Sequence, residues 1–172
     1  NISDDADWSG AVAEVSRVVS EMAGIQLGPK QAPMVENRLR ARMSRLGIDD
    51  MTGYVRHLLA NKESESQALL SLMTTHHTYF FREFTHFEFL LNKGLDQILA
   101  GVRERGDNTL RVWSAACSRG QEAYSLAMFL NFHVTRAMPG LKIEILGTDV
   151  DPESVSIATN GVYKHDELKQ SP

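Results

Sequence analysis

The sequence has few of the features that mark secreted or membrane proteins. Its one cysteine, Cys117, excludes an internal disulfide and suits a reducing compartment. No apolar run approaches the ~20 residues that a membrane-spanning helix needs, and the first residues lack the basic and apolar regions of a secretion signal. These absences predict a globular cytoplasmic protein without direct membrane insertion.

Signatures of metal and dinucleotide sites are missing as well. His76 and His77 are neighbours, but adjacent side chains seldom converge on one ion, and no cluster of cysteine, histidine and aspartate supplies further ligands. The glycine fingerprint G-x-G-x-x-G of dinucleotide-binding folds is also absent. We therefore expect no metal, and an NAD-linked oxidoreductase is a disfavoured alternative.

Positive charge is concentrated in one segment. The chain has a formal net charge of −4, whereas residues 30–45 contain five basic residues and one acidic residue. Arg38, Arg42 and Arg45 are spaced i, i+4, i+7, so they share one face of a predicted helix. A basic patch on an acidic protein favours one acidic partner over general polyanions, so no nucleic acid is expected. The alternative is a solvated helix face.

The first part of the chain has the apolar spacing of helices. Ser9 is the predicted cap of the first helix, which would end near Gly24, and Gly47 would end the second. The apolar faces predicted for these two helices contain Val12, Val15, Val19, Met22, Val35, Leu39, Met43 and Leu46. Two further helices are predicted before residue 74.

A β-α-β-α pattern occupies the last part of the chain. Strands are predicted near residues 110–114 and 142–148, with a helix between them. Asp151 is the predicted cap of a short last helix that ends at Gly161. Only two parallel strands are clear, whereas parallel sheets usually have more strands and both faces covered.

These patterns predict an α/β fold class in two parts. Residues 1–88 would form a small all-helical N-terminal domain that carries the basic helix. Residues 89–172 would form the front portion of a Rossmann-like domain, with about two parallel strands and their helices. The open edge of such a sheet would permit self-association by strand pairing.

Two acidic residues follow the predicted strands. Asp149 ends the second strand, where an acidic residue takes ribose hydroxyls in dinucleotide-binding folds; alternatively it only ends the strand. Glu122 stands beside the start of the preceding helix, where it would repel a pyrophosphate but attract a sulfonium. It favours S-adenosylmethionine (SAM) over NAD, unless it only complements the positive end of its helix.

Arg82 follows an apolar cluster, Tyr79–Phe81, that can hold its guanidinium in place. Because arginine binds carboxylates bidentately, Arg82 is a candidate for binding the carboxylate of a substrate or cofactor. The alternative is a surface ion pair with Glu83.

Three ordered segments, residues 75–83, 111–125 and 147–151, resemble the CheR chemotaxis receptor methyltransferases, and Asn160–Tyr163 is similar to that family too. The resemblance implies a SAM-dependent protein-glutamate O-methyltransferase with S-adenosylhomocysteine as its product. Its partner would be the cytoplasmic helical domain of chemotaxis receptors.

The resemblance also implies roles for single residues. Thr78, Arg82, Glu122 and Asp149 would contact the cofactor, and Arg82 would also lie near the reacting carboxylate as the catalytic candidate. His76 would be a further cofactor contact, at a position where some relatives have asparagine.

The basic face of Arg38, Arg42 and Arg45 would dock the receptor helices. The family continues into further strands that this sequence lacks, so the chain is expected to be an incomplete portion of the enzyme. The alternative is a non-catalytic receptor-docking or signalling module derived from the same family.

Overall fold

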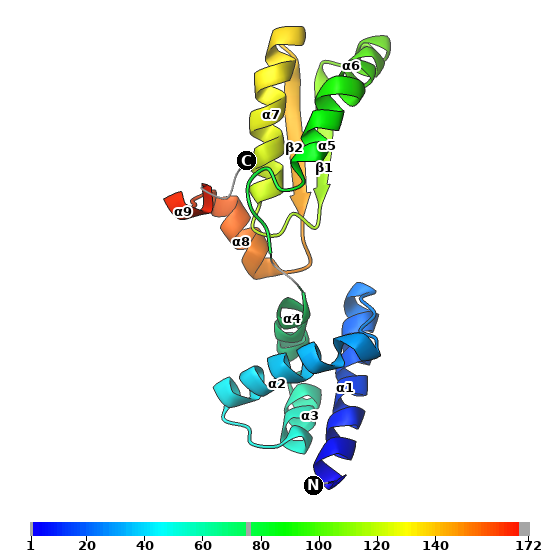
Figure 1. Ribbon diagram of the computed structural model, residues 1–172, viewed down its shortest axis with the longest axis vertical. Helices are drawn as coiled ribbons and strands as arrows, with labels where there is room; N and C mark the ends of the chain where they lie inside the picture. The colour runs from blue at the N-terminus through cyan, green and yellow to red at the C-terminus, as the bar shows by residue number, and fades with distance from the viewer. Residues whose placement is uncertain (1, 75–76, 169–172) are drawn as a thin grey trace. The chain divides into compact units, whose positions relative to one another are not determined.

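The computed structural model describes residues 2–74 and 77–168, and these form two compact units, one in each range (Figure 1). The first unit is all-helical, and the second contains a parallel two-stranded sheet with helices. The predicted fold class, a small helical domain followed by a partial Rossmann-like domain, is therefore confirmed. No helix within the described ranges combines the length and the apolar character that crossing a membrane requires.

The elements of the first unit largely follow the predicted periodicity. They are α1 (Ile2–Ala23), the 3-10 turn η1 (Pro29–Gln31), α2 (Ala32–Leu46), α3 (Met51–Ala60) and α4 (Lys62–Met73). Gly47 ends α2 with a φ of 67°, as predicted. The prediction that Ser9 caps the first helix is wrong, because Ser9 lies within α1. The stretch before it contains neither glycine nor proline, so nothing there stops the helix from starting earlier.

The core of the first unit is built from the faces that the helices turn toward one another. Its buried members include Val15, Val19, Val35, Leu39, Met43, Tyr54, Leu58, Leu69 and Met73. Met22, predicted on the apolar face of α1, is instead exposed near the end of that helix.

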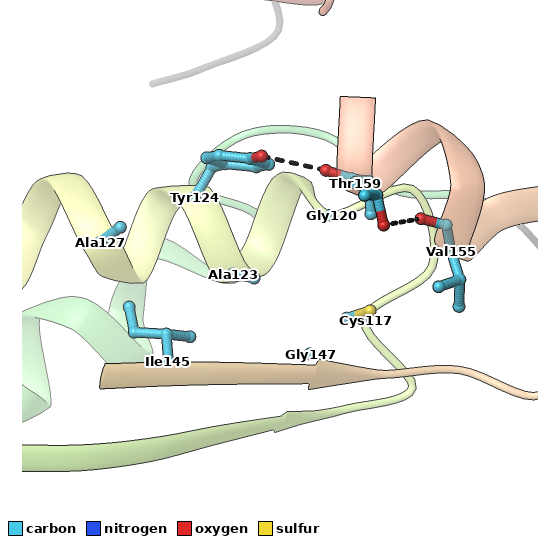
Figure 2. Close-up of a pocket in the computed structure, with 10 residues that line it drawn as sticks. Cys117, Gly120, Ala123, Tyr124, Ala127, Ile145, Gly147, Val155 and Thr159 are labelled. Atoms are coloured by element: carbon cyan, nitrogen blue, oxygen red, sulfur yellow. Dashed lines mark hydrogen bonds between the residues drawn. The ribbon is translucent and has the colours of Figure 1, made fainter. Parts of the chain in front are cut away.

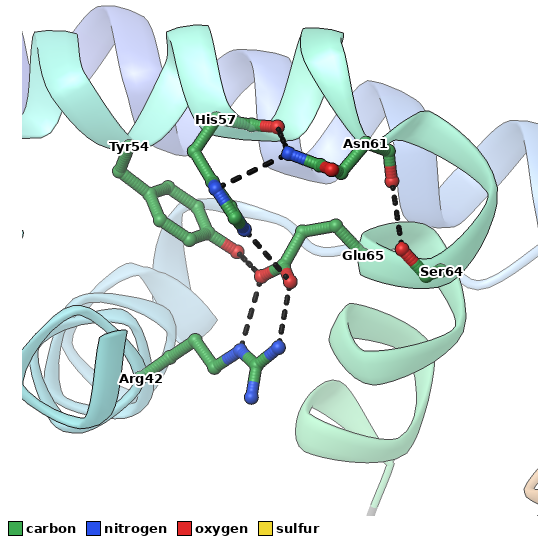
Figure 3. Close-up of polar contacts among 6 residues, drawn as sticks. All are labelled: Arg42, Tyr54, His57, Asn61, Ser64 and Glu65. Carbon is green, nitrogen blue, oxygen red and sulfur yellow. Dashed lines mark hydrogen bonds and ion pairs between the residues drawn. The ribbon is translucent and has the colours of Figure 1, made fainter.

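A buried carboxylate links α2, α3 and α4 (Figure 3). Glu65 is 2% exposed, and its Oε1 and Oε2 accept hydrogen bonds from Arg42 Nε at 3.1 Å and Nη2 at 2.6 Å. The Tyr54 hydroxyl donates to Oε1 at 2.8 Å, and His57 Nε2 lies 3.5 Å from Oε2. Burial alone would raise the pKa of Glu65, but the hydrogen bonds from Arg42 and Tyr54 outweigh it and hold that pKa below its usual value.

The second unit begins with a turn at residues 77–83, continues with a nearly continuous helical segment, and then alternates between strands and helices. Its elements are α5 (Phe84–Phe89), the π-helical turn η2 (Leu90–Gly94), α6 (Leu95–Glu104), β1 (Thr109–Ala115), α7 (Gln121–Ala137), β2 (Lys142–Thr148), α8 (Pro152–Asn160) and α9 (His165–Leu168). β1 and β2 are parallel, in a register that runs from Thr109 opposite Lys142 to Ala115 opposite Thr148. Asp151 caps α8, as predicted, by accepting from Ser154 N.

Among the described residues, one face of this sheet is covered and the other is largely exposed. Leu110 and its neighbours pack with the apolar sides of α6 and α7, and α7 runs alongside β2 (Figure 1). On the opposite face Trp113 is 68% exposed and Leu146 is 62% exposed. Within the described ranges no third strand pairs with either edge. A parallel sheet normally has both faces covered. The described residues cover only one face of this sheet.

The division between the units falls before residue 77, earlier than the predicted boundary between residues 88 and 89. Phe80 is buried against Tyr163, and Phe87 belongs to the core of the second unit. Apolar spacing alone could not assign this segment, because helical periodicity continues on both sides of it.

The Glu65 cluster generates a prediction about stability. Glu65→Gln should lower the free energy of unfolding of the first unit by about 3 kcal/mol, because it leaves Arg42 half-buried without its counter-charge. Urea unfolding, followed by amide NMR signals of α2–α4, measures the change. The exposed pair Arg40–Glu36 provides the control, since Glu36→Gln should cost under about 1 kcal/mol.

The same cluster sets a pH dependence. The pKa of Glu65 is lowered in the folded state, so its contribution to stability is present above the unfolded pKa of about 4.3 and is lost as the pH falls through the folded value. The acid-induced loss of stability should shrink in Glu65→Gln. An unchanged acid profile would contradict the assigned role of the carboxylate.

Candidate functional site

The loop between β1 and α7 is held in an unusual backbone conformation. Ala116 and Ser118 have φ values of 60° and 50°, and Gly120 has a φ of 93°. Left-handed conformations cost non-glycine residues roughly 1–2 kcal/mol each, so they persist only where the surroundings fix them. Such strain clusters at ligand-binding loops, and this loop lies at the carboxyl end of a parallel sheet, where α/β folds bind ligands.

Asp149 is the residue that fixes this loop from the neighbouring strand. Its Oδ2 accepts a hydrogen bond from Ser118 N at 2.8 Å, and its Oδ1 accepts one from Asp151 N at 2.9 Å. The loop also continues the sheet pairing, since Cys117 N donates to Thr148 O. Each carboxylate oxygen has two lone pairs, so Asp149 can bind two further donors, such as a pair of hydroxyls.

Glu122 brings a second carboxylate to the same loop. It lies in the first turn of α7, and Ser114 Oγ at the end of β1 donates to its Oε1 at 2.6 Å. Burial raises the pKa of the Cys117 thiol, and the negative charges of Asp149 and Glu122 raise it further. Both carboxylates therefore act on the loop, and Cys117 stays a protonated thiol rather than a nucleophile.

Arg82 lies in a turn just before α5. Its side chain is 49% exposed, and Nη1 donates to the carbonyl oxygen of His77 at 2.8 Å. The flanking residues Phe81 and Glu83 have φ values of 55° and 54°. The ion pair with Glu83, the alternative role for Arg82, is weak because the nearest atoms are 3.9 Å apart.

The Arg82 turn is attached to the helix that carries Glu122. Phe81 N donates to Ser125 Oγ at 2.9 Å, across 44 positions of sequence. Thr78 lies half-buried in the same turn segment, whereas His76 lies outside the described residues. The structure thus joins the Arg82 turn to α7, and the Asp149 strand end to the loop before α7.

Two tyrosines that were not predicted as site residues connect the loop and α7 to the segment that contains α8. Tyr163 donates its hydroxyl to Arg119 O at 2.6 Å, and Tyr124 donates to Ala158 O at 3.0 Å. Burial is the main cause that raises the pKa of Tyr163 to about 12, so it remains a donor at neutral pH. Its ring also packs edge-on against Phe80, which precedes Arg82 by two positions. The one indication of a role for Tyr163 in the sequence is that it ends the family-like segment Asn160–Tyr163.

A hollow of about 270 Å³ lies beneath the loop, between α7, β2 and α8 (Figure 2). Its lining is small or apolar and includes Cys117, Ala123, Ala127, Ile145 and Val155. Asp149 and Glu122 do not line it, and none of its lining side chains is charged. The hollow and the two carboxylates are therefore separate features of one loop. Within residues 2–74 and 77–168, no group of three or more metal-binding side chains gathers.

The three predicted docking arginines do not form a free basic face. Arg38 Nη1 donates to Leu72 O and Thr74 O at the end of α4, at 2.6 and 2.9 Å, while Arg42 is bound to Glu65. Arg45 alone of the three is exposed. The expected docking face of three free arginines is therefore corrected to one exposed arginine. Helical spacing shows that side chains share one side of a helix, but not that a neighbouring helix binds them.

Comparisons with known proteins agree with the two-unit structure. Residues 11–74 match the family model "CheR methyltransferase, all-alpha domain", and residues 76–172 match "CheR methyltransferase, SAM binding domain". The matched ranges meet where the structure divides.

Curated relatives carry the name chemotaxis protein methyltransferase. The protein from Escherichia coli K12 is 38% identical over 90% of this chain and 51% of its own length. That from Salmonella typhimurium is 38% identical over 90% and 50%, and that from Borreliella burgdorferi 32% over 94% and 57%. The chain spans about half the length of the curated relatives it matches.

The geometry of the loop predicts different costs for two glycine substitutions. A Cβ on Gly120 would lie 2.8 Å from the Tyr163 hydroxyl oxygen and 3.1 Å from the Ala158 Cα, in addition to the strain of a φ of 93°. Gly140 has a similar φ of 88° but nothing within 4 Å. Gly140→Ala should therefore cost about 1 kcal/mol of unfolding free energy, and Gly120→Ala about 2 kcal/mol more. Urea unfolding of both variants checks the difference, and equal costs would rule out the close packing around Gly120.

Proposed function

Because this chain belongs to the CheR methyltransferase family, we propose that it is part of a SAM-dependent methyltransferase of chemotaxis receptors. The observation that carries the proposal is the Asp149 carboxylate, which two backbone N–H groups fix beside a strained loop. The reaction proposed is the methylation of glutamate side chains on the cytoplasmic helices of the receptor.

The donor set fits the groups of SAM. Asp149 has acceptor capacity for the two ribose hydroxyls, and its orientation is set before a ligand arrives. Glu122 supplies a negative charge for the sulfonium or the amino group of the methionine part. Two carboxylates around one loop disfavour a pyrophosphate, which argues for SAM over a dinucleotide.

When bound, SAM supplies an electrophilic methyl group, which a glutamate oxygen takes as the carbon–sulfur bond breaks and its electrons pass to sulfur. A glutamate with a pKa near ~4.3 is already ionised at neutral pH, so the protein needs no general base. The work left to the residues of this chain is positioning and the exclusion of water.

Arg82 is proposed as the catalytic residue that orients a carboxylate. Its guanidinium is half-exposed, and one of its N–H groups donates to His77 O. The remaining N–H groups can bind a carboxylate bidentately. Thr78, from the same segment, is a proposed further cofactor contact. His76 stays a prediction from the family resemblance.

Receptor docking is proposed for α2, with a smaller role for its arginines than their spacing suggested. Arg38 and Arg42 hold α2 against α4. Their contribution to docking is therefore indirect, because they fix the position of α2 within the helical unit. Arg45 is the exposed cation that can face an acidic receptor helix.

The ribose assignment predicts that Asp149→Asn weakens the binding of S-adenosylhomocysteine. Replacing charge-assisted hydrogen bonds by weaker ones should reduce affinity by about tenfold or more. Isothermal titration calorimetry on the 172-residue chain measures it. The control is Glu153→Gln, an exposed acid in the first turn of α8 that should leave affinity unchanged. Equal affinities of Asp149→Asn and the unsubstituted chain would remove the assigned role.

The sulfonium assignment predicts a charge-selective effect of Glu122→Gln. The variant should lose more affinity for SAM, whose sulfur is positively charged, than for S-adenosylhomocysteine, whose sulfur is neutral. A difference of about threefold to tenfold is expected for one partly solvated charge pair. If both ligands lose affinity equally, Glu122 faces the amino group that they share. No loss for either ligand would place Glu122 outside the site.

A further inference from the structure

We propose that Ser125 is a positioning residue that sets the Arg82 turn against the start of α7. The proposal rests on the proposed function in one respect: Arg82 and Glu122 are taken as cofactor contacts. Ser125 itself is 0% exposed, so it touches no ligand and acts through the two segments that it joins.

The Ser125 hydroxyl makes a bond in each direction. Its Oγ donates to Gln121 O at 2.6 Å, in the first turn of α7 beside Glu122. The same oxygen accepts from Phe81 N at 2.9 Å, one residue before Arg82. A hydroxyl has one donor and two acceptor lone pairs, so a single oxygen can connect both segments without leaving its proton unpaired.

The outgoing bond is common in helices, whereas the incoming bond is not. Serine and threonine often donate to the carbonyl four residues earlier. Thr135, in the same helix, does so with Asn131 O at 2.6 Å, and it lies exposed near the end of α7. Ser125 differs because its oxygen is buried and receives a backbone N–H from a segment 44 positions away.

The Arg82 turn needs such a tether because its backbone is strained. Phe81 and Glu83, on either side of Arg82, both have left-handed φ values. The turn's own hydrogen bond, from Arg82 N to Tyr79 O, is long at 3.4 Å. The Phe81 ring packs with Phe84 and Phe87, which fixes the side chain but does not satisfy the backbone N–H. Without Ser125 Oγ, that part-buried N–H would lose its acceptor and the turn could relax.

The test combines Ser125→Ala with a double-mutant cycle on the 172-residue chain. We expect Ser125→Ala to weaken S-adenosylhomocysteine binding about fivefold, the worth of roughly one hydrogen bond. In the Arg82→Ala background the same substitution should have a clearly smaller effect, because the main group that it positions is gone. An equal loss in both backgrounds would overturn the proposal, since a purely structural serine acts independently of Arg82.

Two further variants keep the test decisive. Ser125→Cys keeps the shape with a weaker acceptor, so its affinity should lie between those of the unsubstituted chain and Ser125→Ala, and it replaces Ser125→Ala if that variant does not fold. Thr135→Ala removes only hydrogen bonds to Asn131, within the same helix, and should leave affinity unchanged. An effect of Thr135→Ala as large as that of Ser125→Ala would contradict the proposal.

Amide hydrogen exchange separates this proposal from the proposed function. Exchange at Phe81 and Arg82 should accelerate at least about fivefold in Ser125→Ala and remain unchanged in Thr135→Ala. If the chain binds neither SAM nor S-adenosylhomocysteine, the proposed function fails, but accelerated exchange would still support the tether. Unchanged exchange at both amides would overturn the positioning role whatever the ligand result.

Discussion

The second unit depends on the hydrogen bonds that the Asp149 carboxylate accepts. This carboxylate stands at the end of β2, holds the β1–α7 loop through Ser118 N, and holds the start of α8 through Asp151 N. The loop contains three left-handed residues and would relax without an anchor. One side chain therefore both stabilises the strained loop and presents acceptors at the sheet's carboxyl end. A ligand that binds it finds a group whose orientation is already fixed, which lowers the entropic cost of binding.

Other contacts follow the same principle, in which one polar atom joins segments that are distant in the sequence. Tyr163 holds the loop at Arg119 O, and Ser125 ties the Arg82 turn to α7. In the first unit Glu65 does the corresponding work for three helices, with a buried charge instead of a hydroxyl. A buried ion pair is a costly way to gain stability, but removing one partner is costlier still. Arg42 is therefore needed chiefly as the counter-charge of Glu65, and less as a residue that docks a receptor.

Much of this architecture could be predicted, because its signals are local. Short stretches of sequence are enough to predict the bounds of β2, the Asp151 cap and the end of α2 at Gly47. The partners of Arg38 and Arg42 could not be predicted, since they lie on α4, and spacing within α2 says nothing of the helix opposite. In the site, Asp149 could be predicted because an acidic residue after the second strand is typical of ribose binding. Glu122 could be predicted because a carboxylate at the start of a helix would repel a pyrophosphate but attract a sulfonium. Ser125 could not be predicted, because a serine inside a helix has an ordinary local explanation.

The charge of the site has a consequence for turnover under the proposed function. Asp149 and Glu122 both lie close enough to raise the pKa of Cys117, so the negative charge of both carboxylates acts on the loop. Such negative charge stabilises a positively charged sulfur more than a neutral one. Methyl transfer removes that positive charge, and the attraction of Glu122 for the sulfur disappears with it. The same carboxylate that favours the substrate form of the cofactor would then ease the release of the product form, without any movement of the protein.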